Sequence, residues 1–342
     1  MTKYRRPDDA TETVSEPLFV PPRPTAVLSA GSRLGDRYVV RGVLGSGGFA
    51  VVYLADDLRD GGEVALKVLR PERVSEATLR RFRREAEVAR QAASPHLVAV
   101  GDVGVADGSP YLAMEHVPGE SLGTRLDRGP LGVEAAIALS RQVLAGLAAL
   151  HDHGILHRDV KPQNVLLGDD GVARLVDYGL ALSPLHARQT RATATQAVVG
   201  TVEYLSPEQA LGETADPRSD LYSFGVLLFE MLTGRLPHHA KSTLGTLVAH
   251  VQRPAPDVRS LRPQVPPWLA ALVARLLAKR PEERYASAAD VLADLEARRA
   301  TRYRRRRTRG EILRLAAAAL ALALLALAAG WFLRGVSEPR TA

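Results

Sequence analysis

Between residues 38 and 68, apolar and polar positions alternate in three short runs that are separated by glycine-rich or charged turns. The runs YVVRGVLGSGG, FAVVYLADD and EVALKVL predict three antiparallel strands. The helix predicted next, at residues 75–93, has Phe82 and small residues on one face and charged residues on the other. Two further strands complete a small lobe of five strands and one helix; they are predicted near residues 97–105 and 110–115.

After Gly119 the apolar residues recur mainly at helical spacing. The clearest helix runs from residue 134 to 151, and Gly154 behind it is a typical helix stop signal. Short strands and loops are predicted from residue 155 to about 182. The second lobe is therefore mainly helical, with further helices predicted at residues 219–232, 242–252, 267–277 and 287–299.

The two ends of the chain differ from its middle. Residues 1–33 mix Pro, Thr, Ser and charged residues without periodicity, which is typical of a disordered tail. Residues 315–333 carry no charge, and their length is about the minimum for a helix that crosses a bilayer. An amphipathic or buried helix is the alternative, but the arginines at 304–307 before the segment and Trp331 near its far end favour a membrane span.

Composition narrows the chemistry. The 342 residues include no cysteine, which excludes disulfide frameworks, cysteine nucleophiles, iron–sulfur clusters and thiolate zinc sites. The net charge of +7 comes from residues 298–314, where nine arginines and one acid give +8, so the remainder carries −1. This distribution does not indicate a nucleic-acid-binding surface. Only five of the 45 basic residues are lysines, so a lysine among apolar neighbours is a candidate for a specific role.

A glycine-rich turn lies between the first two predicted strands. A strand follows it, whereas dinucleotide-binding folds have a helix at that point. Backbone N–H groups of such a turn can approach phosphates closely. We therefore take this turn as a candidate phosphate-binding loop made of Leu44, Gly45, Ser46, Gly47, Gly48, Phe49, Ala50, Val51 and Val52.

Lys67 lies in the third predicted strand among apolar residues. Eighteen residues later, Glu85 falls on the predicted helix and is a candidate ion-pair partner. Such a pair would hold the Lys67 ammonium against the α- and β-phosphates of a nucleotide.

The most specific motif is HRDVKPQN, at residues 157–164. Asp159 can accept or orient a hydroxyl proton, Lys161 can neutralise a transferred phosphoryl group, and Asn164 can hold a metal ion. A polar surface turn is the alternative, which is disfavoured because Asp177 follows thirteen residues later in an Asp-Tyr-Gly triplet. Carboxylate and amide oxygens suit Mg²⁺. The histidine pairs at 151/153 and 238/239 are expected to be helix-end and loop residues and not zinc ligands.

Together and in this order, the motifs resemble those of the bacterial eukaryotic-like (Hanks-type) serine/threonine protein kinases. The resemblance covers about three quarters of the chain, residues 38–298, and includes SPE at 206–208, DLYSFG at 220–225 and Arg284. It implies an α+β, two-lobed protein kinase fold, with a small five-stranded antiparallel sheet plus one helix and a larger, mainly helical lobe, followed by a single transmembrane helix.

The resemblance and the composition of the two ends together divide the chain. The kinase domain is expected at residues 34–298, with an N-lobe at 34–117 and a C-lobe at 118–298. The flanking segments are expected to be a Pro-rich tail at 1–33, an Arg-rich juxtamembrane segment at 299–314, the transmembrane helix at 315–333 and a short extracytoplasmic tail at 334–342.

Several further roles follow from the resemblance. Met114 corresponds to the gatekeeper, and Glu115 to Val117 correspond to the hinge that binds adenine. Three residues correspond to structural anchors. The pair Glu208 and Arg284 holds the end of the activation segment, and Asp220 braces the catalytic-loop backbone.

Arg158, directly before Asp159, implies regulation by phosphorylation of the activation segment. The candidate sites are Thr190, Thr193 and Thr195, of which we favour the last two. Lys161 together with Gly200-Thr201 resembles the serine/threonine class and not the tyrosine class.

Three residues depart from the commonest family pattern. Ala50 replaces the third glycine of the loop, and Ser206 replaces alanine in the Ala-Pro-Glu motif. Tyr178 replaces phenylalanine, and its hydroxyl needs a hydrogen-bond partner. None of these changes removes a charged catalytic group.

The sequence therefore predicts a serine/threonine protein kinase that uses ATP and Mg²⁺, with Mn²⁺ as an alternative ion, to phosphorylate protein hydroxyls in membrane-anchored signalling. The catalytic residues would be Lys67, Glu85, Asp159 and Lys161, with Asn164 and Asp177 as metal ligands. A pseudokinase is disfavoured because these charged and metal-binding residues are present. A small-molecule kinase is disfavoured by the complete activation segment.

Arginines concentrate on the N-terminal side of residues 315–333, which places the kinase domain in the cytoplasm of a single-pass membrane protein. The Arg cluster is expected to contact anionic lipid headgroups. A nucleic-acid-binding tail is the alternative, disfavoured by the apolar run that follows. A homodimer could serve autophosphorylation in trans.

Overall fold

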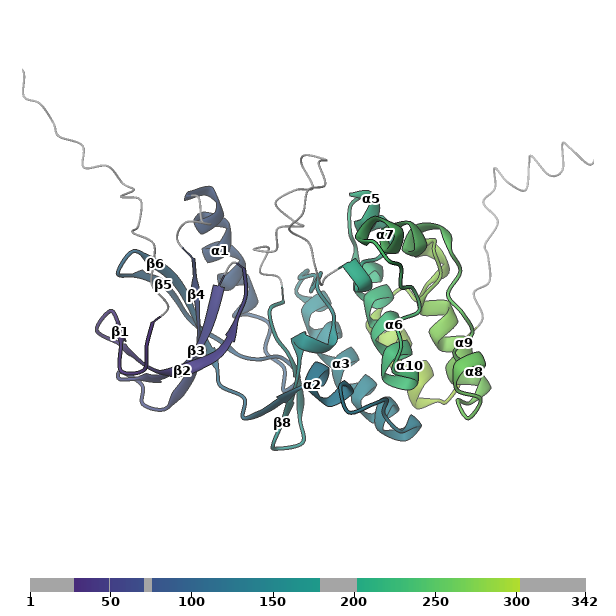
Figure 1. The fold of residues 1–342 in the computed structure, drawn as a ribbon, viewed down its shortest axis with the longest axis horizontal. Coiled ribbons are helices and arrows are strands. Elements are labelled where there is room, and N and C mark those ends of the chain that lie inside the picture. The colour runs from purple at the N-terminus through teal and green to yellow at the C-terminus, as the bar shows by residue number, and fades with distance from the viewer. Residues whose placement is uncertain (1–27, 49, 71–75, 179–201, 302–342) are drawn as a thin grey trace, which may run out of the picture. The chain divides into compact units, whose positions relative to one another are not determined.

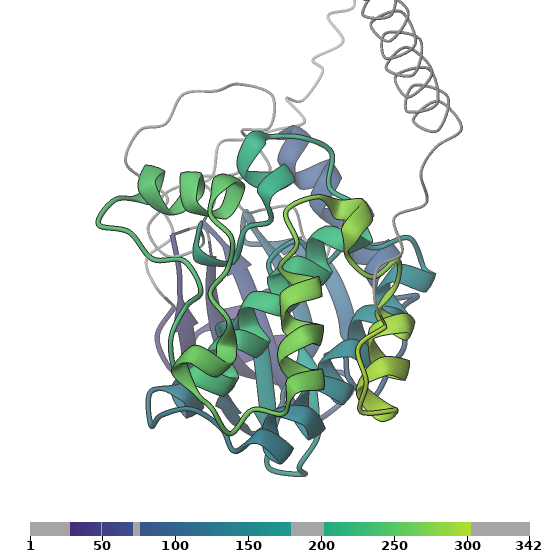
Figure 2. The same cartoon turned by 90° about the vertical axis from the view of Figure 1, so that its right-hand side faces the viewer.

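A computed structural model of the protein describes residues 28–48, 50–70, 76–178 and 202–301. In the first helix, the side chains at positions 76–78, 81 and 85 also lie outside the description. The described part has two lobes, with the strands of one lobe and most helices of the other clearly separated in Figure 1. Figure 2 views it from the helical side, where green helices stand in front of the purple strands.

The N-lobe is a six-stranded antiparallel sheet in the order β1-β2-β3-β4-β6-β5. Helix α1 (Glu76–Ala89) buries Phe82 and Ala86 with Leu69 and Leu112 of the sheet in one apolar cluster. The strands are β1 (Arg33–Leu34), β2 (Tyr38–Ser46), β3 (Ala50–Asp57), β4 (Glu63–Leu69), β5 (Val100–Ala106) and β6 (Ser109–Glu115).

The C-lobe is built around α3 (Val133–Asp152) and α6 (Pro217–Thr233), whose apolar residues share the largest core cluster. A small sheet, β7-β8-β9, lies on the side toward the N-lobe. The other elements are β7 (Gly119–Ser121), α2 (Leu122–Leu126), η2 (Pro162–Asn164), β8 (Val165–Gly168), β9 (Ala173–Leu175), η3 (Val202–Tyr204), α5 (Pro207–Leu211), α7 (Thr243–Gln252), α8 (Val258–Leu261), α9 (Pro267–Leu276), η4 (Pro281–Glu283) and α10 (Ala288–Glu296).

The two-lobed architecture is confirmed, but the prediction of five strands in the sheet is wrong. The sixth strand, β1, has two residues, too few to show alternation in the sequence. Leu34 is buried in the core beside Tyr38. Residues 28–33, assigned to the tail, also lie against the sheet, since Gly31 N donates to Val40 O at 2.8 Å. Residues 1–27 lie outside the described part.

The fourth predicted strand begins later than expected, at Val100 instead of residue 97. Leu97 and Val98 pair with the C-lobe instead. Leu97 forms a bridge with Leu175, and Val98 N donates to Leu175 O at 3.0 Å. This pairing joins the two lobes at Leu175, the last residue of β9.

By length and composition, α3 could span a membrane, and it is the one helix in the described ranges of which this is true. Half of its most apolar stretch is buried inside the C-lobe, including Leu144, Leu147 and Leu150. We therefore assign it as a core helix of the lobe. The predicted span at residues 315–333 lies outside the described residues.

Candidate active site

The HRD loop, which follows α3, is held by one buried carboxylate. Asp220 of α6 accepts hydrogen bonds from the backbone N–H groups of His157 at 2.8 Å and Arg158 at 2.7 Å. His151 Nε2 contacts the same carboxylate at 2.8 Å. Arg158 has a left-handed backbone with φ of +68°, which is unusual for a residue other than glycine. Asp220 therefore stabilises a strained turn directly before Asp159.

Asp159 is surrounded on one side only. Its Oδ2 accepts from Lys161 Nζ at 2.7 Å and from Asn164 Nδ2 at 3.0 Å. Its Oδ1 is buried and has no hydrogen-bond partner among the described residues. Because a buried acceptor without a partner is costly, this oxygen is suited to a proton donor supplied by a substrate.

Lys67 and Asp177 connect the two lobes. Lys67 Nζ, on β4, donates to Asp177 Oδ1 at 2.6 Å. Burial raises the pKa of Asp177, but the charge and hydrogen bond of Lys67 outweigh burial and hold it below its usual range. Asp177 also has a left-handed backbone, with φ of +59°. The carboxylate is therefore ionised and aimed at the junction of the lobes.

Asn164 and Asp177 fit a divalent cation. The Asn164 amide nitrogen donates to the backbone carbonyl oxygen of Asp159 at 2.8 Å and to the Asp159 carboxylate at 3.0 Å, which leaves the Asn164 amide oxygen for a metal. Lys67 contacts only Oδ1 of Asp177, which leaves the second carboxylate oxygen. An amide oxygen and a carboxylate oxygen are hard ligands of the kind that Mg²⁺ and Mn²⁺ take. No cluster of three His, Cys, Asp or Glu side chains suited to a metal exists among the residues that the structure describes.

The glycine-rich loop joins β2 to β3 in the N-lobe, and an apolar cluster joins this lobe to the C-lobe. A Cβ atom placed on Gly45 or Gly48 would meet nothing within 4 Å, so internal packing does not require glycine at either position. The backbone is thus accessible to a ligand. The cluster contains residues of both lobes, among them Val52, Ala65, Met114, Val117, Leu166 and Val176. Phe49 lies outside the described residues.

Residues 38–294 of this chain match the family described as "Protein kinase domain". The chain belongs to the protein kinase family. The serine/threonine-protein kinase PrkC of Bacillus subtilis is 38% identical over 268 residues, which are 78% of this chain and 41% of PrkC. PknL of Mycobacterium tuberculosis, also a serine/threonine-protein kinase, is 42% identical over 280 residues, which are 79% of this chain and 69% of PknL.

Solved structures agree with these sequence relatives. The crystal structure of the Mycobacterium tuberculosis PknI kinase domain has a TM-score of 0.64 and 28% identity, covering 80% of this chain and all of that one. The kinase domain of this chain is thus of the bacterial serine/threonine class. The chain spans less than half the length of PrkC and about two thirds that of PknL.

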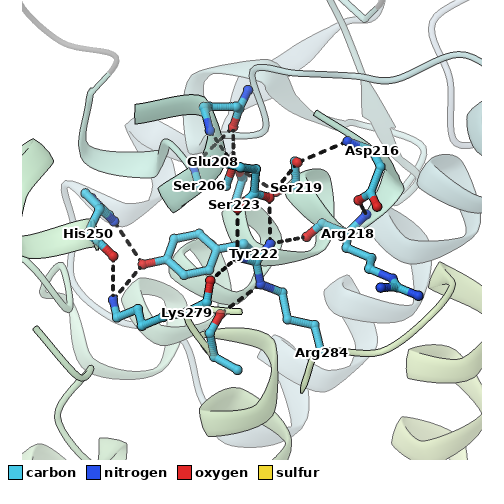
Figure 3. A network of polar contacts seen from close by, with 12 residues as sticks. Ser206, Glu208, Asp216, Arg218, Ser219, Tyr222, Ser223, His250, Lys279 and Arg284 are labelled. Atoms are coloured by element: carbon cyan, nitrogen blue, oxygen red, sulfur yellow. Dashed lines mark hydrogen bonds and ion pairs between the residues drawn. The ribbon is translucent and has the colours of Figure 1, made fainter. Parts of the chain in front are cut away.

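In the kinase domain, the end of the activation segment is anchored by a buried ion pair, drawn in Figure 3. Arg284 donates to both carboxylate oxygens of Glu208, at 2.7 and 2.9 Å, and Ser219 Oγ donates to Glu208 Oε1 at 2.6 Å. Arg284 also donates to the carbonyls of Arg218 and Lys279, both at 3.0 Å. The pair is therefore satisfied on nearly every side, as a buried ion pair must be.

The tyrosine of the kinase Asp-Tyr-Gly triplet has the partner that its hydroxyl requires. Tyr178 is buried, and its hydroxyl donates to Val98 O at 2.6 Å. Burial raises the pKa of Tyr178 to about 12, so the hydroxyl keeps its proton. Because Val98 is also tied to β9, this hydrogen bond adds to the link between the lobes.

Some sequence-predicted kinase residues cannot be placed. The side chain of Glu85 and residues 190, 193, 195, 200 and 201 lie outside the described residues. Glu115, expected in the hinge, is placed at the end of β6, where its carboxylate accepts from Ala99 N at 3.1 Å and contacts Arg174 Nε at 3.4 Å.

Two features of the C-lobe escaped sequence reasoning. Lys279 Nζ lies in the network of Figure 3 and donates to Tyr222 Oη at 3.1 Å, His250 O at 2.8 Å and His238 Nε2 at 3.0 Å. The rarity of lysine in this chain drew attention to Lys279. Its partners could not be predicted, because they lie on three segments that are distant in the sequence. Gln209 is the second; its S-x-x-Q spacing from Ser206 predicts a helix cap and nothing more.

Proposed function

We propose that this kinase domain is catalytically active and transfers the γ-phosphate of ATP to serine and threonine hydroxyls of proteins. One observation carries the proposal. Lys161 and Asn164 converge on one oxygen of Asp159 and leave the other unpartnered, while Lys67 reaches Asp177 from the opposite lobe. A non-catalytic scaffold has no need of such a buried, half-satisfied carboxylate.

The proposed nucleotide site uses both lobes. The backbone around Gly45 and Gly48 would cradle the phosphates, and the apolar cluster that includes Ala65 and Leu166 would hold the adenine. Lys67 would contact the α- and β-phosphates. A divalent cation, Mg²⁺ or Mn²⁺, would be held by Asn164 and Asp177 and would neutralise phosphate charge when bound.

The proposed chemistry is an in-line displacement at phosphorus. The substrate hydroxyl donates to Asp159 Oδ1, which orients the oxygen and takes its proton. The oxygen forms a bond to the γ-phosphorus while the bond from that phosphorus to the β–γ bridging oxygen breaks, and ADP leaves. Lys161, 2.7 Å from Asp159 Oδ2, is placed to stabilise charge on the transferred group.

We also propose that the activation segment is autophosphorylated at Thr190, Thr193 or Thr195, with Arg158 as the cation that pairs with the phosphate. In support, Arg158 lines a cavity of about 260 Å³ together with residues 212–215. A phosphothreonine brings close to two negative charges that a guanidinium can bind. Replacing all three threonines with alanine should lower activity and abolish phosphate in this segment by mass spectrometry; unchanged activity contradicts the proposal.

The remaining proposals concern location and partners. Residues 315–333 would anchor the protein in the cell membrane with the kinase domain in the cytoplasm, and the Arg cluster at 298–314 would contact anionic lipids. Protein serine and threonine residues would be the substrates, with a homodimer as the form that autophosphorylates in trans. No nucleic-acid partner is proposed.

The test of catalytic function is a labelled-phosphate transfer assay on a generic protein substrate. Label from γ-labelled ATP should appear on serine or threonine, and it should vanish in Lys67→Met, which removes the ammonium from the site while the lobes stay folded. Label on tyrosine, or full transfer by a folded Lys67→Met variant, would refute the assignment.

A further inference from the structure

Gln209, the third residue of α5, uses both ends of its side-chain amide. Its Oε1 accepts from Ser206 N at 3.1 Å and from Ser206 Oγ at 3.0 Å. Ser206 Oγ in turn accepts from Gln209 N at 3.4 Å, which completes a capping box at the start of α5. The other end, Nε2, donates to the carbonyl oxygen of Arg158 at 3.2 Å. The amide thus joins its own helix to the catalytic loop, 51 residues earlier in the chain.

The carbonyl that Gln209 holds belongs to a strained residue. Arg158 has φ of +68°, and its N–H is bound to Asp220 Oδ1 at 2.7 Å. Gln209 fixes the opposite end of the same residue, the peptide group that leads into Asp159. The N–H of the same peptide donates to His157 Nδ1 at 3.3 Å, so Gln209 adds the hydrogen bond on the carbonyl side that resists rotation of this peptide toward an unstrained conformation.

Helix α5 is itself a fixed support. Glu208, directly before Gln209, is buried in the ion pair with Arg284 and receives the Ser219 hydroxyl (Figure 3). The helix is therefore anchored on its inner side by charge and at its start by the capping box. A hydrogen bond from such a helix can set the orientation of a loop peptide.

We propose that Gln209 is a positioning residue for phosphoryl transfer, which holds the peptide between Arg158 and Asp159 so that the Asp159 carboxylate faces the substrate hydroxyl. This inference rests on the proposed function. It also means that the anchored end of the activation segment is coupled to the catalytic loop by one hydrogen bond. The competing interpretation is that Gln209 only caps α5.

A pair of substitutions separates the two interpretations. Glutamate at this helix position completes a capping box as well as glutamine does, so Gln209→Glu keeps the cap. It replaces the donor with a carboxylate that faces the Arg158 carbonyl oxygen. Ser206→Ala is the matched control, since it removes the cap hydroxyl and leaves the bond from Gln209 to Arg158 in place.

The experiment measures kcat, KM for ATP and melting temperature of the full chain and both variants. For Gln209→Glu we expect a kcat about tenfold lower, with an unchanged KM and melting temperature. As the pH is lowered, protonation of the introduced carboxyl restores a donor, so kcat relative to wild type should rise. For Ser206→Ala we expect a melting temperature a few degrees lower and an unchanged kcat.

Each kcat is referred to the fraction of protein that binds nucleotide, so that loss of fold is not counted as loss of catalysis. A Gln209→Glu variant with wild-type kcat per binding site overturns the inference, whatever its melting temperature. A reduced kcat without recovery at low pH also overturns it. A wild-type protein that transfers no phosphate refutes the proposed function itself, and the inference with it.

Discussion

Asp159 is the residue whose contacts support the proposed chemistry most directly. One of its carboxylate oxygens is bound by Lys161 and Asn164, and the other is buried without a partner among the described residues. An unsatisfied buried acceptor costs about 1–3 kcal/mol, and such costs persist where function requires them. The tight loop that produces this arrangement depends on Asp220, which is 61 residues away in the chain.

Removal of the Tyr178 hydroxyl should destabilise the domain. Tyr178→Phe restores the commoner residue of the family but leaves the carbonyl of Val98 without its donor. We expect the free energy of unfolding, measured by urea denaturation, to fall by about 1–2 kcal/mol. Tyr111→Phe is the matched control, because that hydroxyl donates to the part-exposed Asp102, and its loss should cost less. A Tyr178→Phe variant as stable as wild type would contradict the account.

Residue identity could be predicted where chemistry lies in one short run. Asp159, Lys161 and Asn164 stand within six positions, so their convergence follows from the sequence spacing. Gln209 could not be assigned in this way, since its amide contacts Arg158 from a distant helix. Leu166 could not be assigned for a related reason, since an apolar residue in a strand gives no sign of which apolar cluster it joins.

At the scale of elements, the long helices and the strands of six or more residues were predicted well, and the two-residue strand β1 was not. The helices predicted at 134–151 and 219–232 match α3 and α6 to within two residues at each end. Strand β1 has two residues and exists because β2 offers it a partner edge. Its stability comes from tertiary contacts, which local sequence does not report.

Helix α7 contacts α6 through the buried His250, which lies 3.0 Å from the Tyr222 hydroxyl and packs against the buried His238, and these two histidines make stability depend on pH. Burial and the nearby Lys279 lower the pKa of His238 to about 4 and, with His238 itself, that of His250 to about 3. The unfolded chain binds these protons near pH 6.5, so the unfolded state takes up more protons in this window and stability falls as the pH drops from about 6.5 to 4.

Each of these histidines should contribute up to about 1.4 kcal/mol per pH unit to the loss. Urea denaturation between pH 7 and 4.5 measures the slope. His250→Gln keeps an acceptor for the Tyr222 hydroxyl and removes one titrating group, so its slope should be smaller than that of wild type. An identical slope in the two proteins would show that His250 does not titrate in this way.

At the scale of the whole molecule, the proposed anchor makes a separate prediction. After alkaline carbonate and after high salt, the full chain should stay in the membrane fraction, as a spanning segment at 315–333 requires. Arg298 and Arg299 contact Glu134 and Asp294, at 2.8 and 3.0 Å, so lipid contact would fall to the arginines beyond them. Release by either treatment would reduce the segment to a peripheral anchor, and digestion of the kinase domain by external protease in intact cells would reverse the orientation.

The central claim is that Asp159 performs phosphoryl transfer to serine and threonine. The most direct measurement compares wild type with Asp159→Asn for both labelled-phosphate transfer and equilibrium nucleotide binding. Asparagine keeps the size of the side chain but cannot take a proton. The account predicts nucleotide binding within about twofold of wild type and transfer reduced by roughly 100-fold or more. Transfer at the wild-type rate by a variant that binds nucleotide normally would contradict it.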